Sequence, residues 1–165
     1  MTHLVIVEGI SDRGVVESLA ERLGVKVKVL LMRGNRPRKV SRMVNAALST
    51  DAYDKVIMLK DTHKLPEGKV RELSDRAVKE VDHERKYVVI VKKSIESWIL
   101  AGIGVSKAEE VDEPDKYLNT LLSRAGRRYI KSEELARKLI SEVDLSRAQR
   151  NSESLREFME LLKDP

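Results

Sequence analysis

Short apolar runs alternate repeatedly with longer helical patterns over the first 100 residues. Runs rich in β-branched residues predict strands at 4–7, 25–32, 55–61 and 86–93. Segments of about 10–15 residues with helical periodicity separate them, which is typical of right-handed crossovers between parallel strands. We therefore predict an α/β fold with a four-stranded parallel sheet and helices on both of its faces.

Helical patterns link these strands and continue beyond them. The first helix ends at Gly24, and after Gly104 the alternation with strands stops. Pro114 and the acids around it predict a loop. Further helices are predicted at 38–48, 67–81, 94–102, 116–125, 132–143 and 152–162. Because helices this short are not stable alone, we expect residues 105–165 to be a helical extension packed on an α/β domain of residues 1–104, as one compact unit.

Composition limits the class of protein. A chain of 165 residues with 41% apolar residues suits one domain with a real core. The absence of cysteine excludes disulfides and thiolate metal sites. No apolar run approaches the roughly 18 residues that span a bilayer, so we expect a cytoplasmic protein without a membrane association. The charged fraction of 36% with a single glutamine, Gln149, is typical of thermophile proteins.

The positive charge is unevenly distributed. The net charge is +5, and no Asp or Glu occurs from 22 to 50. Such a run is either a solvated surface or a contact for phosphate, and the absence of interspersed acids favours phosphate. The same choice applies to a later basic group at Arg124, Arg127, Arg128 and Lys131. Including lysines near the strand ends, the predicted phosphate contacts are Arg33, Arg36, Arg38, Lys39, Arg42, Lys60, Lys64 and Lys93.

The partner indicated by this charge is DNA or RNA. Aromatic residues make up only 4% of the chain, so stacking on bases cannot be the main source of affinity. Contact with backbone phosphates is expected instead, and binding should depend on salt and little on sequence. The sequence does not distinguish DNA from RNA.

Acidic residues follow the predicted strands at their carboxyl ends, where open parallel sheets bind ligands. Glu8 follows the first strand, Asp61 ends the third, and Glu96 lies just beyond the fourth. Asp12 and His63 follow within a few residues. Neighbouring strands are about 4.8 Å apart, so these side chains could share a cation such as Mg²⁺ or Mn²⁺. Glu8, Asp12 and Glu96 also have a structural alternative as acids at the start of a helix, and His63 as an exposed loop residue.

A set of short motifs carries a family resemblance. In order along the chain they are VEGISD, MLKDTH, SIESWILAG, DEPDKYL and YIKS. Together they resemble small stand-alone Toprim proteins related to the nuclease half of the overcoming-lysogenisation-defect family. The resemblance covers nearly the whole chain and implies a Toprim domain over 1–104. It also implies metal-dependent phosphoryl transfer on nucleic acid, with Mg²⁺ or Mn²⁺ as the cofactor.

The resemblance assigns roles to the acids one by one. Glu8 corresponds to the general acid/base and Asp61 to the first aspartate of the family's Asp-x-Asp metal motif. Asp12 corresponds to the acid that closes the Glu-Gly-x-x-acid pattern, and Glu96 to an acid after the fourth strand. The implied metal ligands are Glu8, Asp12, Asp61, His63 and Glu96.

Two positions depart from the family pattern. His63 replaces the second aspartate of Asp-x-Asp, and imidazole is a poor ligand for Mg²⁺. Gly102 stands where relatives often carry an aspartate. Two functions therefore remain open: a nuclease, or a Toprim module with weakened or lost catalysis that binds nucleic acid or docks into an RNA- or DNA-processing assembly.

Overall fold

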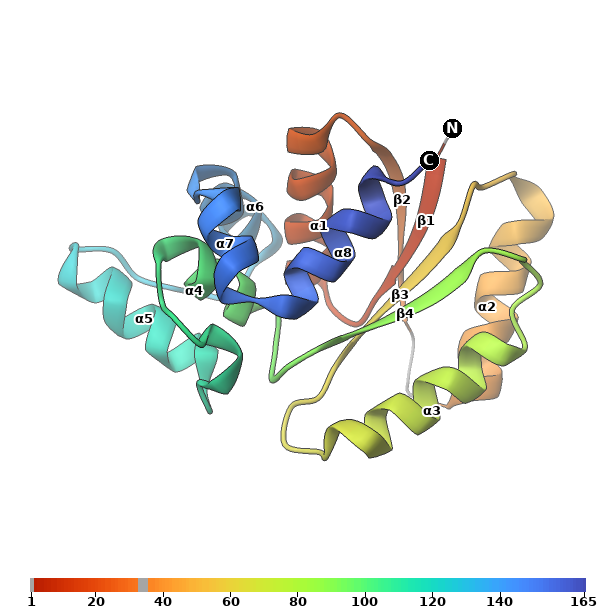
Figure 1. The fold of residues 1–165 in the computed structure, drawn as a ribbon, viewed down its shortest axis with the longest axis horizontal. Coiled ribbons are helices and arrows are strands. Elements are labelled where there is room, and N and C mark those ends of the chain that lie inside the picture. Colours follow the sequence, from red (N-terminus) through yellow and green to blue (C-terminus); the bar gives the residue numbers. More distant parts are fainter. Residues whose placement is uncertain (1, 33–35) are drawn as a thin grey trace.

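Four parallel strands form the centre of the molecule, in the order β2-β1-β3-β4 (Figure 1). They are β1 (Thr2–Val7), β2 (Lys26–Leu31), β3 (Val56–Asp61) and β4 (Lys86–Val91). The computed structural model describes residues 2–32 and 36–165, so the predicted phosphate contact Arg33 lies outside the described residues. The α/β prediction with a four-stranded parallel sheet is confirmed.

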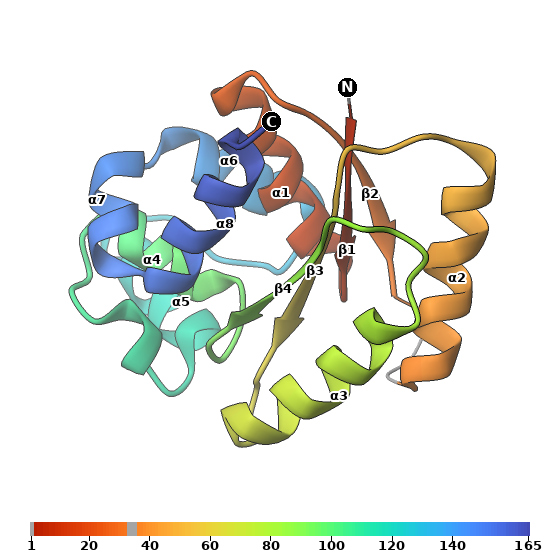
Figure 2. The same cartoon turned by 45° about the vertical axis from the view of Figure 1, so that its right-hand side comes forward.

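Helices cover both faces of the sheet (Figure 2). One face carries α2 (Pro37–Thr50) and α3 (Glu67–Lys79). The other carries α1 (Ile10–Leu23) and the helices that follow β4. The latter are α4 (Glu96–Ile103), a 3-10 turn at Ala108–Glu110, α5 (Pro114–Arg124), α6 (Glu133–Glu142), α7 (Leu145–Asn151) and α8 (Glu153–Lys163).

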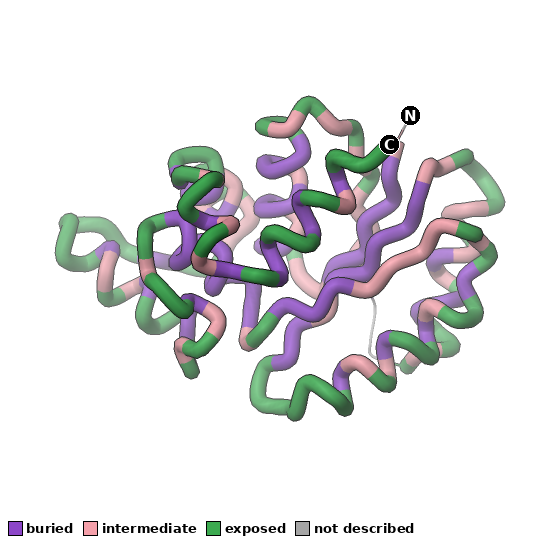
Figure 3. Tube along the Cα trace, in the orientation of Figure 1, coloured by how far each residue is buried: buried purple, intermediate pink, exposed green. Residues whose placement is uncertain are grey.

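The strands supply both cores because side chains alternate between the faces of a sheet. In β1, Val5 and Val7 pack among α1 and the C-terminal helices, whereas Leu4 and Ile6 pack toward α2 and α3. The central strands are buried along their length (Figure 3). This two-sided burial explains why the strands are continuous apolar runs in the sequence.

The helical predictions were wrong at two places in the C-terminal half. Pro114 begins α5 instead of lying in a loop, since the fixed φ of proline suits the first position of a helix. The helix α7 was not predicted, because its seven residues are too few to establish a helical period. Its start is fixed by Asp144, whose side chain accepts the Arg147 backbone N–H at 3.1 Å.

No helix in the described parts of the chain has the length and apolarity needed to cross a bilayer.

Candidate metal centre

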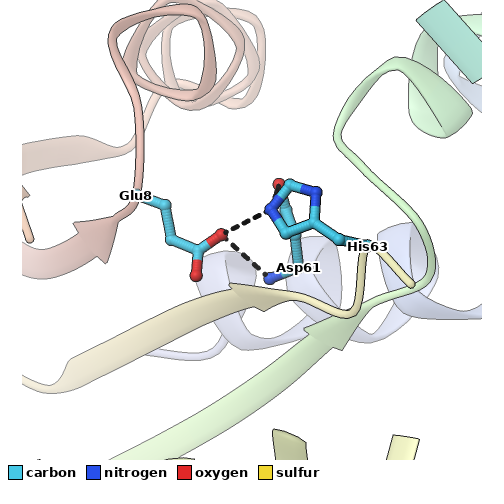
Figure 4. A group of neighbouring side chains, drawn as sticks. All are labelled: Glu8, Asp61 and His63. Carbon is cyan, nitrogen blue, oxygen red and sulfur yellow. Dashed lines mark hydrogen bonds and ion pairs between the residues drawn. The ribbon is translucent and has the colours of Figure 1, made fainter. Parts of the chain in front are cut away.

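Three predicted side chains meet at the carboxyl edge of the sheet. Glu8 follows β1, Asp61 ends β3, and His63 lies two residues further on. One potential ligand atom from each lies within 4.8 Å of the others (Figure 4). The strand order explains the meeting, since β1 and β3 are neighbours from which the chain crosses to opposite sides of the sheet. Such a switch point leaves a crevice beyond the strand ends.

The two oxygens of Glu8 have different surroundings. Oε1 forms an ion pair with the Lys60 ammonium. Oε2 accepts the Asp61 backbone N–H at 3.4 Å and lies 3.5 Å from His63 Nε2. His63 Nε2 is also 3.9 Å from Asp61 Oδ2. The Asp61 side chain is only 8% exposed and the His63 side chain 60%, so the cluster runs from the protein interior to solvent.

Burial and neighbouring carboxylates raise the proton affinity of two of the acids. Burial raises the pKa of Asp61 well above its ordinary value, and the charges of Asp12, Glu8 and Glu96 add to the effect. Burial also raises the pKa of Asp12 to about 6, although the Gly9 backbone N–H, which donates to it at 3.2 Å, acts in the opposite direction. These acids therefore repel one another at neutral pH, and a bound cation would relieve that repulsion.

Asp12 and Glu96 lie outside the group of three ligand atoms that meet within 4.8 Å. Asp12 stands in the first turn of α1, where its contact with Gly9 is the ordinary role of an acid at a helix start. Both nevertheless raise the pKa of Asp61 and so share its electrostatic environment. The structure thus brings Glu8, Asp61 and His63 together as candidate ligands. Asp12 and Glu96 lie outside this group and act on it through their charge.

Glu96 is completely buried and only half satisfied. Its Oε1 accepts the Tyr129 hydroxyl at 3.1 Å and lies 3.4 Å from Lys131 Nζ. Its Oε2 has no hydrogen-bond partner among the described residues. Burial alone would lower the pKa of Lys131, but the charge and hydrogen bond of Glu96, together with the charges of Asp12 and Asp61, outweigh it and the pKa is raised. A buried carboxylate oxygen without a partner is costly, which suits a site that gains a ligand.

Sequence reasoning did not assign Tyr129 and Lys131 to this site. Lys131 was grouped only with other basic residues, and Tyr129 was singled out only through the YIKS motif. The motif was therefore the one signal for their placement, because the segment folds back against α4 across more than 30 residues of chain.

The two loops that border the site are tied together. The His63 backbone N–H donates to the Lys93 carbonyl at 2.9 Å, and the Lys93 N–H donates to Thr62 Oγ1 at 2.8 Å. Both His63 and Lys93 adopt left-handed backbone conformations, with φ of 50° and 67°. This conformation is uncommon for residues other than glycine, although His, Asn and Asp adopt it more readily than most, and such backbone positions concentrate at functional sites.

The predicted phosphate contacts divide into separate groups. Lys64 and Lys93 line a hollow of about 220 Å³ beside His63, whereas Lys60 is paired with Glu8. A groove between α2 and α3 is lined by Arg36, Arg38 and Arg42. Lys39 of α2 is exposed and is not among the described residues that line this groove.

Gly102 has a packing role in this structure. A Cβ atom at this position would lie 2.5 Å from the Cβ of Val143, which is far inside van der Waals contact. A larger side chain at this position could not be accommodated unless the segment around Val143 moved. The glycine therefore has a local steric reason.

The donor set of Glu8, Asp61 and His63 fits a divalent cation, since carboxylate oxygens and imidazole nitrogen are its ordinary ligands. The arrangement does not identify which cation. Comparison of the chain with protein-family models, with curated proteins and with solved structures gave no match.

Proposed function

We propose that this protein is a Toprim-like, metal-dependent nuclease that hydrolyses phosphodiester bonds of DNA or RNA. The observation that supports this most directly is the meeting of Glu8, Asp61 and His63 at the crevice between β1 and β3, with ligand atoms within 4.8 Å. The motif resemblance adds that Glu8 and Asp61 are the positions at which the Toprim family places its acid/base and its metal.

Each residue then has a definite task. Asp61 and His63, with Glu8, would hold Mg²⁺ or Mn²⁺, which when bound supplies charge stabilisation to a phosphate. The ion pair with Lys60 fixes one oxygen of Glu8 and leaves Oε2 turned toward Asp61 and His63. Oε2 is the atom that would accept a proton from the attacking water. Lys64 and Lys93 line the hollow beside His63 and would contact the phosphate there.

The test is cleavage of labelled DNA and RNA oligonucleotides in Mn²⁺, in Mg²⁺ and in EDTA. We expect cleavage with metal only, and a loss of at least about 100-fold in Glu8→Gln and in Asp61→Asn. Asp51→Asn is the matched control, because Asp51 is exposed at the far end of α2. Equal cleavage by wild type and both site variants would refute the proposal.

A second candidate is a Toprim module that binds nucleic acid, or docks into an assembly that processes it, without cleaving. The observation that favours it is the Lys60 ammonium, which already neutralises one oxygen of Glu8. The imidazole of His63 also stands where a second carboxylate would bind Mg²⁺. Calorimetric titration with Mn²⁺ and Mg²⁺, wild type beside Asp61→Asn, separates the two. Nucleic-acid binding that persists in EDTA, without measurable metal binding, would favour the module.

A further inference from the structure

A basic groove of about 670 Å³ lies between α2 and α3. Arg36, Arg38 and Arg42 line one side, Arg76 and Lys79 line the other, and Glu80 is the acid among the lining residues. We propose that this groove binds the phosphates of a nucleic-acid strand and that α3 leads the strand to the metal centre. This inference rests on the proposed function and adds a substrate track to it. The sequence alone did not predict this role for α3.

The charge of the groove is not neutralised by ion pairs with the described residues. The five cationic side chains are exposed, and none forms an ion pair with another described residue. By contrast, Arg13 and Arg137 on the other face each pair with acids of α1 or α6. Unpaired cations on two facing helices create a positive potential that attracts a polyanion.

The two walls of the groove are held in a fixed relation. Asn45 of α2 donates through Nδ2 to the Glu80 carbonyl at 2.8 Å. The Asp82 backbone N–H donates back to Asn45 Oδ1 at 2.8 Å. The end of α3 is therefore attached to the middle of α2, and the backbones that carry the cations are held at a fixed separation before any ligand arrives. Such preorganisation lowers the entropy lost on binding.

The start of α2 adds to the attraction for anions. Pro37 occupies its first turn, and that turn contains no acid. The helix has 14 residues and no side chain caps its N-terminus by a hydrogen bond within the described residues. Its free backbone N–H groups and dipole therefore reinforce the field of Arg36 and Arg38.

The helix α3 connects the groove to the metal centre. A second hollow, of about 260 Å³, contains Glu8, Asp61 and His63 and is lined on its helical side by Val70 and Leu73. Leu73 is only three residues before Arg76, which is about 4.5 Å along a helix axis. Both hollows thus lie along α3. This helix covers the same face of the sheet as α2 (Figure 2).

The chemistry of the groove indicates contact with phosphates and not with bases. The lining residues contain arginines, a lysine, a serine and an asparagine but no aromatic side chain. One arginine guanidinium group can donate two parallel hydrogen bonds to the oxygens of a phosphate, whereas stacking on bases relies mainly on aromatic rings. We therefore expect binding that depends steeply on salt and little on sequence.

The test measures binding of a fluorescein-labelled single strand, DNA or RNA of mixed sequence, by anisotropy in EDTA at about 50–200 mM salt. The variant Arg76→Gln/Lys79→Gln is compared with Lys138→Gln/Arg150→Gln, which removes the same charge from exposed positions on α6 and α7. We expect about tenfold weaker binding by the groove variant and a salt slope lower by about two, since each phosphate contact contributes about one. The charge-retaining variant Arg76→Lys/Lys79→Arg should bind with about wild-type affinity.

Equal affinity and equal salt slope of the groove variant and the control variant would overturn the inference, as would absence of binding by the wild type. Because EDTA removes the metal, this result is independent of cleavage. Failure of the nuclease proposal would instead appear as wild-type protein that binds through the groove but does not cleave in Mn²⁺ or Mg²⁺.

Discussion

The two edges of the sheet handle buried charge in different ways. At the amino edge, the Lys55 side chain is completely buried just before β3. Its Nζ donates to the Leu161 carbonyl at 2.8 Å and to the Asp164 carbonyl, and it also pairs with Asp164 Oδ2 at 3.4 Å. The Lys55 ammonium thus faces acceptors at the C-terminal end of α8. The helix dipole also favours a cation at this end.

At the carboxyl edge, the buried charges are only partly satisfied by the described residues. Glu96 is as completely buried as Lys55, yet its Oε2 has no partner among the described residues. Burial together with nearby carboxylates raises the pKa of Asp12 and of Asp61. Lys55 holds the last helix to the sheet, whereas the acids lower the stability of the edge where they meet. This contrast supports a functional interpretation of the carboxyl edge, since strained and perturbed groups concentrate at functional sites.

The largest expected effect on stability is at the amino edge. Lys55→Met should destabilise the protein by about 3–4 kcal/mol, because it leaves the Leu161 and Asp164 carbonyls without a donor. Chemical denaturation measures the free energy of unfolding. Lys163→Met is the control, since Lys163 is exposed on α8 and its loss should change stability by less than about 0.5 kcal/mol. Similar values for both variants would remove the contrast between the two edges.

A site acid should give the opposite sign. Asp12→Asn should stabilise the protein at pH 7 by about 3 kcal/mol, because the pKa of Asp12 rises from 3.8 to about 6 on folding. Between about pH 4 and pH 6 the unfolded chain loses this proton while the folded protein keeps it, so wild-type stability should fall as pH rises. The gain from Asp12→Asn should therefore be absent near pH 4 and complete above pH 6.

Denaturation curves at several pH values measure this gain. Glu153→Gln is the matched control, because Glu153 is an exposed acid in the first turn of α8. Removing its favourable interaction with the helix dipole should destabilise slightly at neutral pH. A pH-independent effect of Asp12→Asn would contradict the burial of that carboxyl group.

The contrast between the edges also shows what sequence could and could not predict. Glu8 and Asp61 were predictable because each directly follows a buried apolar run, and parallel strands end at one edge. The order of the strands, the pairing of Lys60 with Glu8 and the burial of Lys55 by α8 all depend on contacts between distant segments. No local pattern encodes such contacts, and the same holds for Gly102 against Val143. Only the α2 side of the α2–α3 groove could be predicted, since its arginines form a basic run in the sequence. Arg76 and Lys79 are dispersed among the acids of α3 and give no such signal.

The smallest expected effect concerns metal preference at the carboxyl edge. His63→Asp should raise the affinity for Mg²⁺ by roughly tenfold relative to Mn²⁺, because a carboxylate replaces imidazole. Aspartate tolerates the left-handed conformation at this position, where φ is 50°, so the loop should keep its shape. His63→Asn is the matched control, since asparagine also accepts that conformation but adds no charge. Calorimetric titration with both cations measures the change. If the Asp and Asn variants bind Mg²⁺ with equal affinity, the side chain at position 63 does not contact the cation, and the acids of this edge bind it without His63.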